Sequence, residues 1–166
     1  ASTYVSFRED VTLALQAKMG GIAHLRAYSD TFPNRQFFLG GVDTMRSYRQ
    51  DAMIPQDVID RVASTGVDPV ALVQGAEISM LLRSELRFPL FSDVSAAIFG
   101  EFGNLWADIR YFEPWRLRPS IGLGIRLDTP VGPIALDYGF NVLYRQADRQ
   151  AVGERIGAFN FSIGVF

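Results

Sequence analysis

The sequence predicts an all-β chain: an antiparallel transmembrane β-barrel segment of about six strands, with one short helix in a long loop. Three observations support this fold class. Hydrophobic residues alternate with polar or small residues over long stretches, as in strands whose two faces meet different surroundings. Each stretch approaches the roughly nine to eleven residues with which a tilted strand crosses a bilayer. The connections alternate between short and long, as on the two sides of a membrane barrel.

Composition narrows the classes of function. The chain has 166 residues, enough for a single domain, and a formal net charge of -2, which argues against a nucleic-acid partner. The absence of cysteine excludes disulfides and thiolate metal sites, and one histidine cannot form a cluster, so we expect no metal and no cofactor. No apolar run is long enough for a transmembrane helix. Because no basic and apolar leader follows Ala1, we expect a mature, cleaved or trimmed form.

The strands follow one another along the chain. The first begins at Val11, where odd positions are almost all apolar as far as Leu25. Val5 and Phe7 share this parity, which leaves an earlier start open. A soluble sandwich also alternates, but its strands are usually shorter and its polar face carries more Lys, Glu and Thr. The pattern therefore favours a membrane barrel. The further alternating stretches are 77–88, 94–102, 120–128, 134–141 and 157–166.

The turn "TPVGP" predicts the register of one hairpin. If its centre lies at the Val-Gly step, Leu127 faces Leu136 on the outer side and Arg126 faces Asp137 on the inner side. Arg126 and Asp137 would then form an ion pair in the lumen. Its simplest role is charge neutralisation inside the barrel.

Residues 26–75 form one long loop between the first two strands. In "MIPQDVIDRVAST", Pro55 suits a first helical turn, and apolar residues recur on one face, which predicts a short helix. Earlier in the loop, "FFLGGVDTMRSYRQD" holds two adjacent glycines, Gly40 and Gly41, followed by Arg46 among small and apolar neighbours. A solvated surface loop does not need this combination.

Five stretches occur in an order that resembles a known family: "RQFFLGGVDTMRSY", "SELRFPL", "AAIFGEFGNLW", "IGLGIRLDTPVGPIALDYGF" and the terminal "FNFSIGVF". They resemble the C-terminal barrel region of the BamA/TamA outer-membrane insertase superfamily, also called the bacterial surface antigen domain. The resemblance covers most of the chain and implies the C-terminal part of a sixteen-stranded barrel. It further implies the outer membrane of a Gram-negative-type bacterium, and work in outer-membrane protein assembly or polypeptide transport.

The resemblance also assigns roles to the long loop. In the family this loop is extracellular and folds back into the lumen, and the tip bears a Val-Arg-Gly-Phe or Tyr motif, which Arg46 and Tyr48 match. The family's tip arginine pairs with acidic wall residues, whose positions match Glu85 and Glu101. Both have inward parity here, and a buried guanidinium requires carboxylates. Gly40 and Gly41 would permit the close backbone path. The alternative is that Arg46 is a solvated loop arginine.

The sequence departs from the family at three places. Ser47 replaces the glycine of the tip motif, which puts the tip backbone in doubt, and Glu101 stands where Asp is usual. The C-terminal strand signal consists of Phe159, Phe161, Ile163 and Phe166. Phe166 has an even residue number, whereas the other three have odd numbers, so simple alternation places it on the opposite face of the strand. Either a β-bulge returns Phe166 to the shared face, or the terminal assembly signal is altered.

About six strands cannot close a membrane barrel, because single-chain barrels start at about eight and open edges in lipid are costly. We therefore expect another protein chain to supply the remaining strands; copies of this chain, or an incomplete chain, are the alternatives. The first strand should run outward and the last inward, which would place both termini in the periplasm. The expected partners are membrane lipid, that second chain, and unfolded outer-membrane proteins or secreted polypeptides.

The sequence also allows two other classes of function, a structural subunit and an enzyme. A structural or anchoring barrel subunit of a larger outer-membrane complex, without insertase activity, is the main alternative. An enzyme could use Glu85 and Glu101 as acid and base, but no nucleophile–histidine pair or phosphate loop accompanies them. We therefore expect a protein that is not an enzyme.

Overall fold

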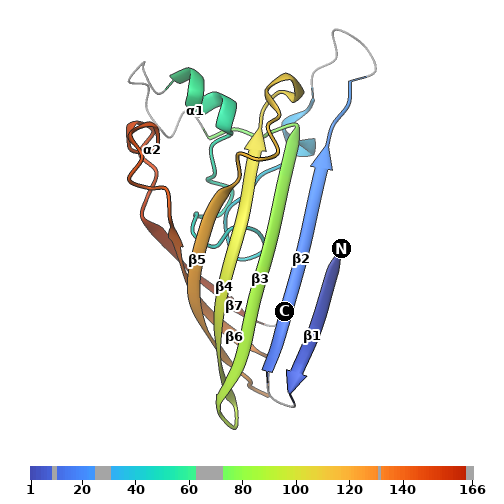
Figure 1. Cartoon of the computed structure of the whole chain (residues 1–166), viewed down its shortest axis with the longest axis vertical. Helices are drawn as coiled ribbons and strands as arrows, with labels where there is room; N and C mark the ends of the chain where they lie inside the picture. The colour runs from blue at the N-terminus through green and yellow to red at the C-terminus, as the bar shows by residue number, and fades with distance from the viewer. Residues whose placement is uncertain (9–10, 25–30, 63–72, 131, 164–166) are drawn as a thin grey trace.

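The computed structural model describes residues 1–8, 11–24, 31–62, 73–130 and 132–163. Its strands form one seven-stranded antiparallel sheet in chain order, which curls around the long loop (Figure 1). The all-β barrel-segment fold is thus confirmed. The strands are β1 (Ser2–Arg8), β2 (Val11–Gly21), β3 (Ile78–Phe91), β4 (Val94–Trp106), β5 (Arg118–Leu127), β6 (Ile134–Asn141) and β7 (Gly157–Ile163).

Short helices lie in the long connections. The predicted helix is α1 (Gln56–Val62), and a second helix, α2 (Ala147–Ala151), precedes β7. The described residues also include two single-turn 3-10 helices, η1 (Pro33–Arg35) and η3 (Ile109–Tyr111). Figure 1 places α1 and α2 at the same end of the sheet, opposite the short turns. Within the described ranges, no helix is long and apolar enough to cross a membrane.

The seventh strand is β1, and it changes the expected direction of the chain. Residues 2–8 form a separate strand that pairs with β2, with Ser2 opposite Gln16. Because apolar residues in 2–8 have the same odd numbering as those in β2, the sequence had also allowed one longer strand. Because the number of strands is odd, β1 and β7 run in the same direction. Ala1 lies beside Ala17, partway along β2. The expectation that the first and last strands run in opposite directions was therefore wrong for this strand order. Strand direction alone thus gives no argument that both termini lie at the same end.

The β5–β6 hairpin also differs from expectation, by two residues. Ile125 pairs with Leu136, and Gly124, not Arg126, lies opposite Asp137. The predicted register was wrong because the hairpin is centred one position before the Val-Gly step: Leu127 pairs with Ile134 and not with Leu136. A shift of two residues keeps every side chain on its predicted face, so Arg126 and Asp137 still point inward.

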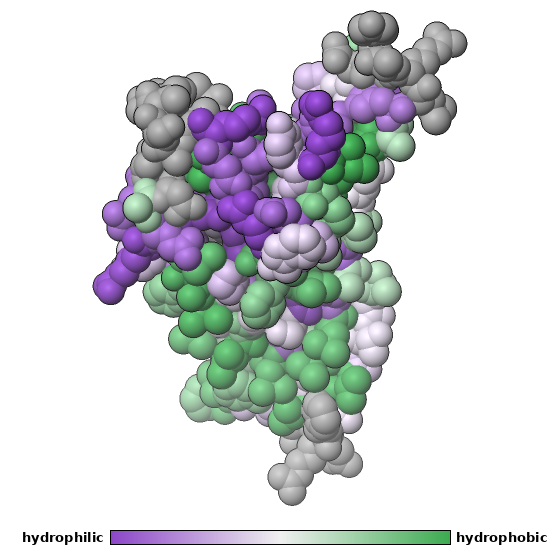
Figure 2. All heavy atoms as spheres, turned by 45° about the horizontal axis from the view of Figure 1, so that its top comes forward, coloured by the Kyte–Doolittle hydropathy of each residue, from purple (hydrophilic) through white to green (hydrophobic). Residues whose placement is uncertain are grey.

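The two faces of the sheet have opposite chemistry. Apolar side chains of the convex face are solvent-exposed: Leu123 by 59%, Phe102 by 48% and Phe161 by 54%. Figure 2 shows apolar residues over the lower part of the face in view and hydrophilic residues gathered at the long-loop end. A soluble protein rarely leaves so large an apolar surface uncovered, whereas lipid accepts it.

The concave face is covered by the long loop. Phe37 and Ala76 form an isolated antiparallel bridge where the loop leaves and rejoins the sheet. Between them, buried side chains of the loop, among them Met45 and Met53, belong to one apolar cluster with Leu81 of β3 and Leu105 of β4. The loop therefore fills the space that a barrel would enclose, and it carries the candidate site.

Candidate functional site

The loop turns back on itself at two adjacent glycines. Gly40 and Gly41 have φ angles of 122° and 95°, where any other residue would be strained. A Cβ atom on Gly40 would lie 2.1 Å from the carbonyl oxygen of Arg49. The amide of Gly41 donates to the carbonyl oxygen of Tyr48 over 3.0 Å. These glycines let the two arms of the loop approach closely enough to close the tip.

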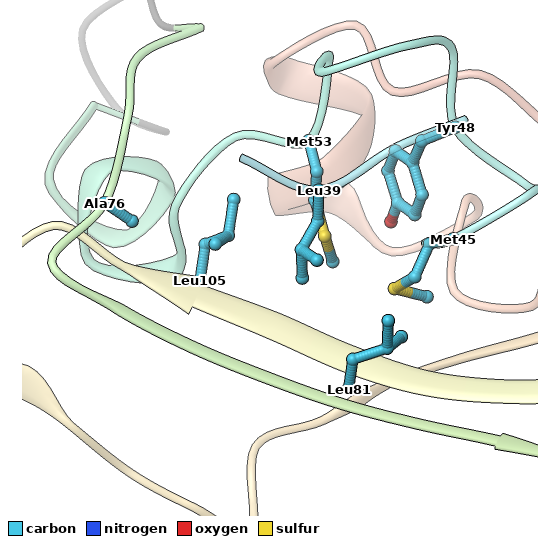
Figure 3. Close-up of a cluster of buried hydrophobic side chains, with 7 residues drawn as sticks. All are labelled: Leu39, Met45, Tyr48, Met53, Ala76, Leu81 and Leu105. Atoms are coloured by element: carbon cyan, nitrogen blue, oxygen red, sulfur yellow. The ribbon is translucent and has the colours of Figure 1, made fainter. Parts of the chain in front are cut away.

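An apolar cluster holds the tip against the wall. Figure 3 shows side chains of the loop pointing toward those of β3 and β4. Met45 is fully buried, and its sulfur occupies space left by Gly103, where a Cβ atom would lie 2.7 Å away. Burial of this kind supplies non-directional attachment. The cluster comprises Leu39, Met45, Tyr48, Met53, Ala76, Leu81 and Leu105.

Arg46 is buried among three carboxylates from three strands. Its Nε donates to Oε1 of Glu101 on β4 over 2.7 Å, and its backbone amide donates to Oε2 of the same residue over 2.8 Å. Its Nη1 donates to Glu85 on β3 over 2.5 Å and to Asp137 on β6 over 3.2 Å. The guanidinium carbon lies 3.4 Å from the centre of the Phe99 ring. Arg46 is therefore not a solvated loop arginine, since only 2% of it is exposed.

The Arg126–Asp137 pair joins the same network. Nη1 of Arg126 donates to Oδ1 of Asp137 over 2.5 Å, and Nη2 reaches Glu85 at 3.3 Å. The two residues meet diagonally, across the position of Gly124. A Cβ atom at Gly124 would lie 1.9 Å from Oδ1 of Asp137, so the glycine makes room for the carboxylate. Two contacts that the sequence suggested separately thus share Glu85 and Asp137.

Arg83 connects the network to the loop backbone, and the sequence did not single it out. Its Nε donates to Glu101 over 3.3 Å, while Nη1 and Nη2 donate to the carbonyl oxygens of Asp43 and Val42, both over 3.1 Å. Charges buried in this way are tolerated only when paired and hydrogen-bonded. We call these residues the tip cluster: Arg46, Arg83, Glu85, Glu101, Arg126 and Asp137.

A second buried ion pair lies nearer the long-loop end. Nη1 of Arg118, at the start of β5, donates to Oε1 of Glu154 over 2.7 Å. Its Nε donates to Oδ1 of Asn104 over 3.0 Å, and its Nη2 donates to the carbonyl oxygen of Ile54. The side chains of Arg118 and Glu154 are 1% and 4% exposed. One arginine thus joins β4, the long loop and the connection after β6.

Tyr48 of the tip motif belongs to this second group. Its hydroxyl donates to Oε2 of Glu154 over 3.2 Å and accepts from Nδ2 of Asn141 over 2.9 Å. Burial raises the pKa of Tyr48 to about 12, so the phenol stays protonated and able to donate at neutral pH. We call these residues the mouth cluster: Tyr48, Asn104, Arg118, Asn141 and Glu154.

Helix α1 docks beside the mouth cluster. Asp57 accepts a hydrogen bond from the Ala107 amide over 2.9 Å, and Asp60 pairs with Arg116 at 2.6 Å. Partial burial would raise the pKa of Asp60, but hydrogen bonds from Arg116 and Gln56 outweigh it and lower that pKa. An apolar group from the loop, from α1 and from the residue after α2 closes the contact: Ile54, Val58, Ile59 and Val152.

The other predicted site residues divide into three cases. Ser47 is 2% exposed, and Asp51 is the one non-glycine residue with positive φ in the described ranges, so the tip backbone does not require glycine at position 47. Phe159, Phe161 and Ile163 lie on the convex face, each more than half exposed at 64%, 54% and 55%. Phe166 lies outside the described residues.

The mouth cluster is what sequence reasoning missed. Arg118 shares the inward parity of Arg126, so a signal for a second inward charge was present on β5. Glu154 lies in a connection without periodicity, and nothing in the sequence relates it to Arg118. Its role depends on how that connection folds.

The charged side chains of both clusters attach segments of the chain to one another. Among residues with described placement, no group of three or more His, Asp or Glu side chains could hold a metal ion. His24 pairs with Glu77, beyond the end of β3 and outside both clusters. The carboxylates that could act as acid or base instead hold arginines in ion pairs.

Known proteins are similar to this chain in sequence. A family model described as "Omp85 superfamily domain" matches residues 1–166. Outer envelope protein 80, chloroplastic, from Arabidopsis thaliana is 28% identical over 142 residues, which are 80% of this chain and 15% of that protein. The outer membrane protein assembly factor BamA of Nitratidesulfovibrio vulgaris (strain Hildenborough) is 28% identical over 152 residues, 89% of this chain and 17% of BamA.

A solved structure extends the comparison to the fold. The crystal structure of BamA from Haemophilus ducreyi lacking POTRA domains 1-3 superimposes with a TM-score of 0.66 at 15% identity, and it covers 96% of this chain and 32% of that one. The chain spans less than a fifth of the length of the curated relatives it matches. The resemblance to the C-terminal barrel region of the BamA/TamA group is confirmed, and since the family model matches throughout, the chain belongs to the Omp85 superfamily.

Proposed function

We propose that this chain is the C-terminal part of an outer-membrane barrel that acts in outer-membrane protein assembly or polypeptide transport. The observation that carries the proposal is the seating of Arg46 on three strands at once. The loop is fixed on the inner wall of an open sheet whose outer face suits lipid. Such a loop would keep the wall ordered while another polypeptide binds at one edge of the sheet. No covalent step is involved.

The outer edges of the sheet support a larger barrel. β1 and β7 each pair with one neighbour in this sheet, so each leaves one row of backbone groups without a strand. In lipid such an edge costs several kcal/mol per unpaired group. We propose that a further polypeptide segment, on another chain, completes the wall. The long loops would face outward, and the short turns and the C-terminus would face the periplasm.

Completion can be tested by gentle extraction from the membrane. Co-purification in detergent, followed by intact mass measurement of the complex and of its separated chains, should show a stoichiometric second chain. A mass equal to this chain alone, or to a simple multiple of it, would contradict completion by a different chain.

The function can be tested by photo-crosslinking from the last strand. A crosslinker placed at Phe161, outward on β7, should capture unfolded barrel proteins or secreted polypeptides during synthesis. The matched control is Ile125, which is 49% exposed on the convex face of β5 but lies within the wall. Capture at Phe161 above the level at Ile125 supports assembly or transport. Equal low capture, with stable stoichiometric partners only, would favour an anchoring subunit instead.

A further inference from the structure

The loop tip contacts a fourth strand, the last one. While the Arg46 side chain binds carboxylates of β3, β4 and β6, its carbonyl oxygen accepts a hydrogen bond from Nδ2 of Asn160 on β7 over 2.7 Å. The same residue is thus held by its side chain on one part of the wall and by its main chain on another.

The β6–β7 ladder is shaped to receive the tip backbone. Asp137 and Asn160 are cross-strand partners, so the two side chains that grip Arg46 from this ladder stand next to each other. The neighbouring inward pair is Gly139 and Ala158. Because both residues are small, the main chain of the tip can approach the sheet closely. A Cβ atom on Gly139 would lie 2.5 Å from the main chain of Arg46. The tip therefore lies directly on the last two strands.

The attachment to β7 differs in kind from the other three. β3, β4 and β6 hold Arg46 through carboxylates, whereas β7, with the sequence GAFNFSI, carries no charged residue. A neutral amide hydrogen bond is weaker than a charge-assisted one. When it breaks, Arg46 keeps its carboxylates, and no buried charge is left alone. β7 can therefore separate from the tip at low cost, while β3, β4 and β6 cannot.

We propose that Asn160 is a positioning residue that couples the last strand to the loop tip, so that seating of the tip and position of β7 each depend on the other. Such coupling is reciprocal: whatever displaces β7 weakens the seating of the tip, and unseating the tip loosens β7 by the same factor. The inference rests on the proposed function, in which β7 is the edge that another polypeptide approaches.

The forward half of the coupling can be measured at the tip. Because the chain has no cysteine, Ser47→Cys supplies its one thiol, at a site buried in the seated tip. In the assembled barrel in membranes, Asn160→Ala should raise the maleimide labelling rate of that thiol about five- to tenfold, the effect of losing one hydrogen bond. Asn160→Asp, which keeps the size but loses the donor, should do the same.

The control stands on the same face of the same strand. Ser162 points inward two residues further on, and its hydroxyl has no hydrogen-bond partner among the residues that the structure describes. Ser162→Ala should change labelling less than twofold. If neither Asn160 variant exceeds this control in a barrel that still folds, the coupling is refuted.

The reverse half is measured on β7. Glu101→Gln weakens the seating of Arg46, and hydrogen exchange of residues 157–163 should then accelerate about as much as labelling did, while β2 stays unchanged. In the double variant Glu101→Gln/Asn160→Ala, the exchange rate of β7 should rise by less than the product of the two single increases. Two residues with independent structural roles would give that product. Unchanged exchange in β7, or simple multiplication, would overturn the proposal. These readouts do not depend on activity, so failed substrate capture at Phe161 would count against the function alone.

Discussion

The tip cluster and the mouth cluster are both buried inside the same sheet, yet they are built differently. The tip cluster draws its three carboxylates from the wall itself, on β3, β4 and β6. The mouth cluster has one carboxylate, Glu154, supplied by a connection and shared with a phenol and an amide. The first attaches the long loop to strands, and the second joins the long loop and the connection after β6 to β4, β5 and β6.

The difference concerns what is left when one member is removed. Glu101 accepts hydrogen bonds from both Arg46 and Arg83, so its loss affects two guanidinium groups. Glu154 also pairs with two arginines, Arg118 and Arg149. When Glu154 is gone, Arg118 keeps Asn104 and the carbonyl oxygen of Ile54, and Arg149 keeps the side-chain oxygen of Gln56. A buried charge without a carboxylate is costly, and neutral acceptors reduce that cost. We therefore expect the wall-based cluster to dominate stability.

The largest effect should come from Glu101→Ala. It leaves the buried Arg46 and the partly buried Arg83 with fewer acceptors. It should lower the free energy of unfolding by about 3–5 kcal/mol, measured by denaturant titration of the detergent-solubilised barrel. Glu101→Gln should cost less, because it retains an acceptor oxygen. The control is Arg110→Ala, which removes the exposed partner of Asp108 and should leave the midpoint in place. Equal unfolding midpoints for Glu101→Ala and this control would contradict the expectation that the tip cluster dominates stability.

Glu154→Gln should have the next largest effect. It removes the one carboxylate of the mouth cluster and should cost about 2–3 kcal/mol in the same titration. Proteolysis of the intact protein should locate the damage, with earlier cleavage near α1 than in the wild type. A loss greater than that of Glu101→Ala would reverse the order of the two clusters.

Gly139→Ala sharpens the comparison by separating shape from charge. The added methyl group would lie against the main chain of Arg46 and should cost about 1–3 kcal/mol through overpacking, although every charge remains. Gly100→Ala is the matched control, since its nearest neighbour is the Ser84 hydroxyl at 3.3 Å. If both variants behave alike, close backbone contact does not contribute to seating.

The smallest effect is expected for Tyr48→Phe. It deletes one hydroxyl, but Asn141 and Glu154 still contact each other at 3.1 Å, so the loss should be about 1 kcal/mol. The unfolding midpoint and the labelling of a thiol at position 47 should both change little. A loss as large as that of Glu154→Gln would mean that the phenol, not the carboxylate, organises the mouth cluster.

Particular residues show how far sequence reasoning reached. The inward positions of Glu85, Glu101, Arg126 and Asp137 followed from alternation, and the family resemblance brought Arg46 to the first two. That Asp137 also contacts Arg46 was not foreseen, because contact across three strands depends on sheet curvature and not on parity. The separate β1 was missed because odd-numbered apolar residues lie on the same face whether the chain continues as one strand or turns back as a hairpin.

The sequence by itself determined the fold class, the face of each strand residue and the glycine-dependent turn at Gly40 and Gly41, because these depend on local spacing and backbone sterics. Only the tertiary structure decided the β5–β6 register, the union of two ion pairs into one network, the mouth cluster and the contact of Asn160 with the tip. Each of these depends on how far apart side chains from distant segments come to lie. That distance is set by loop length and sheet curvature, which residue periodicity does not encode.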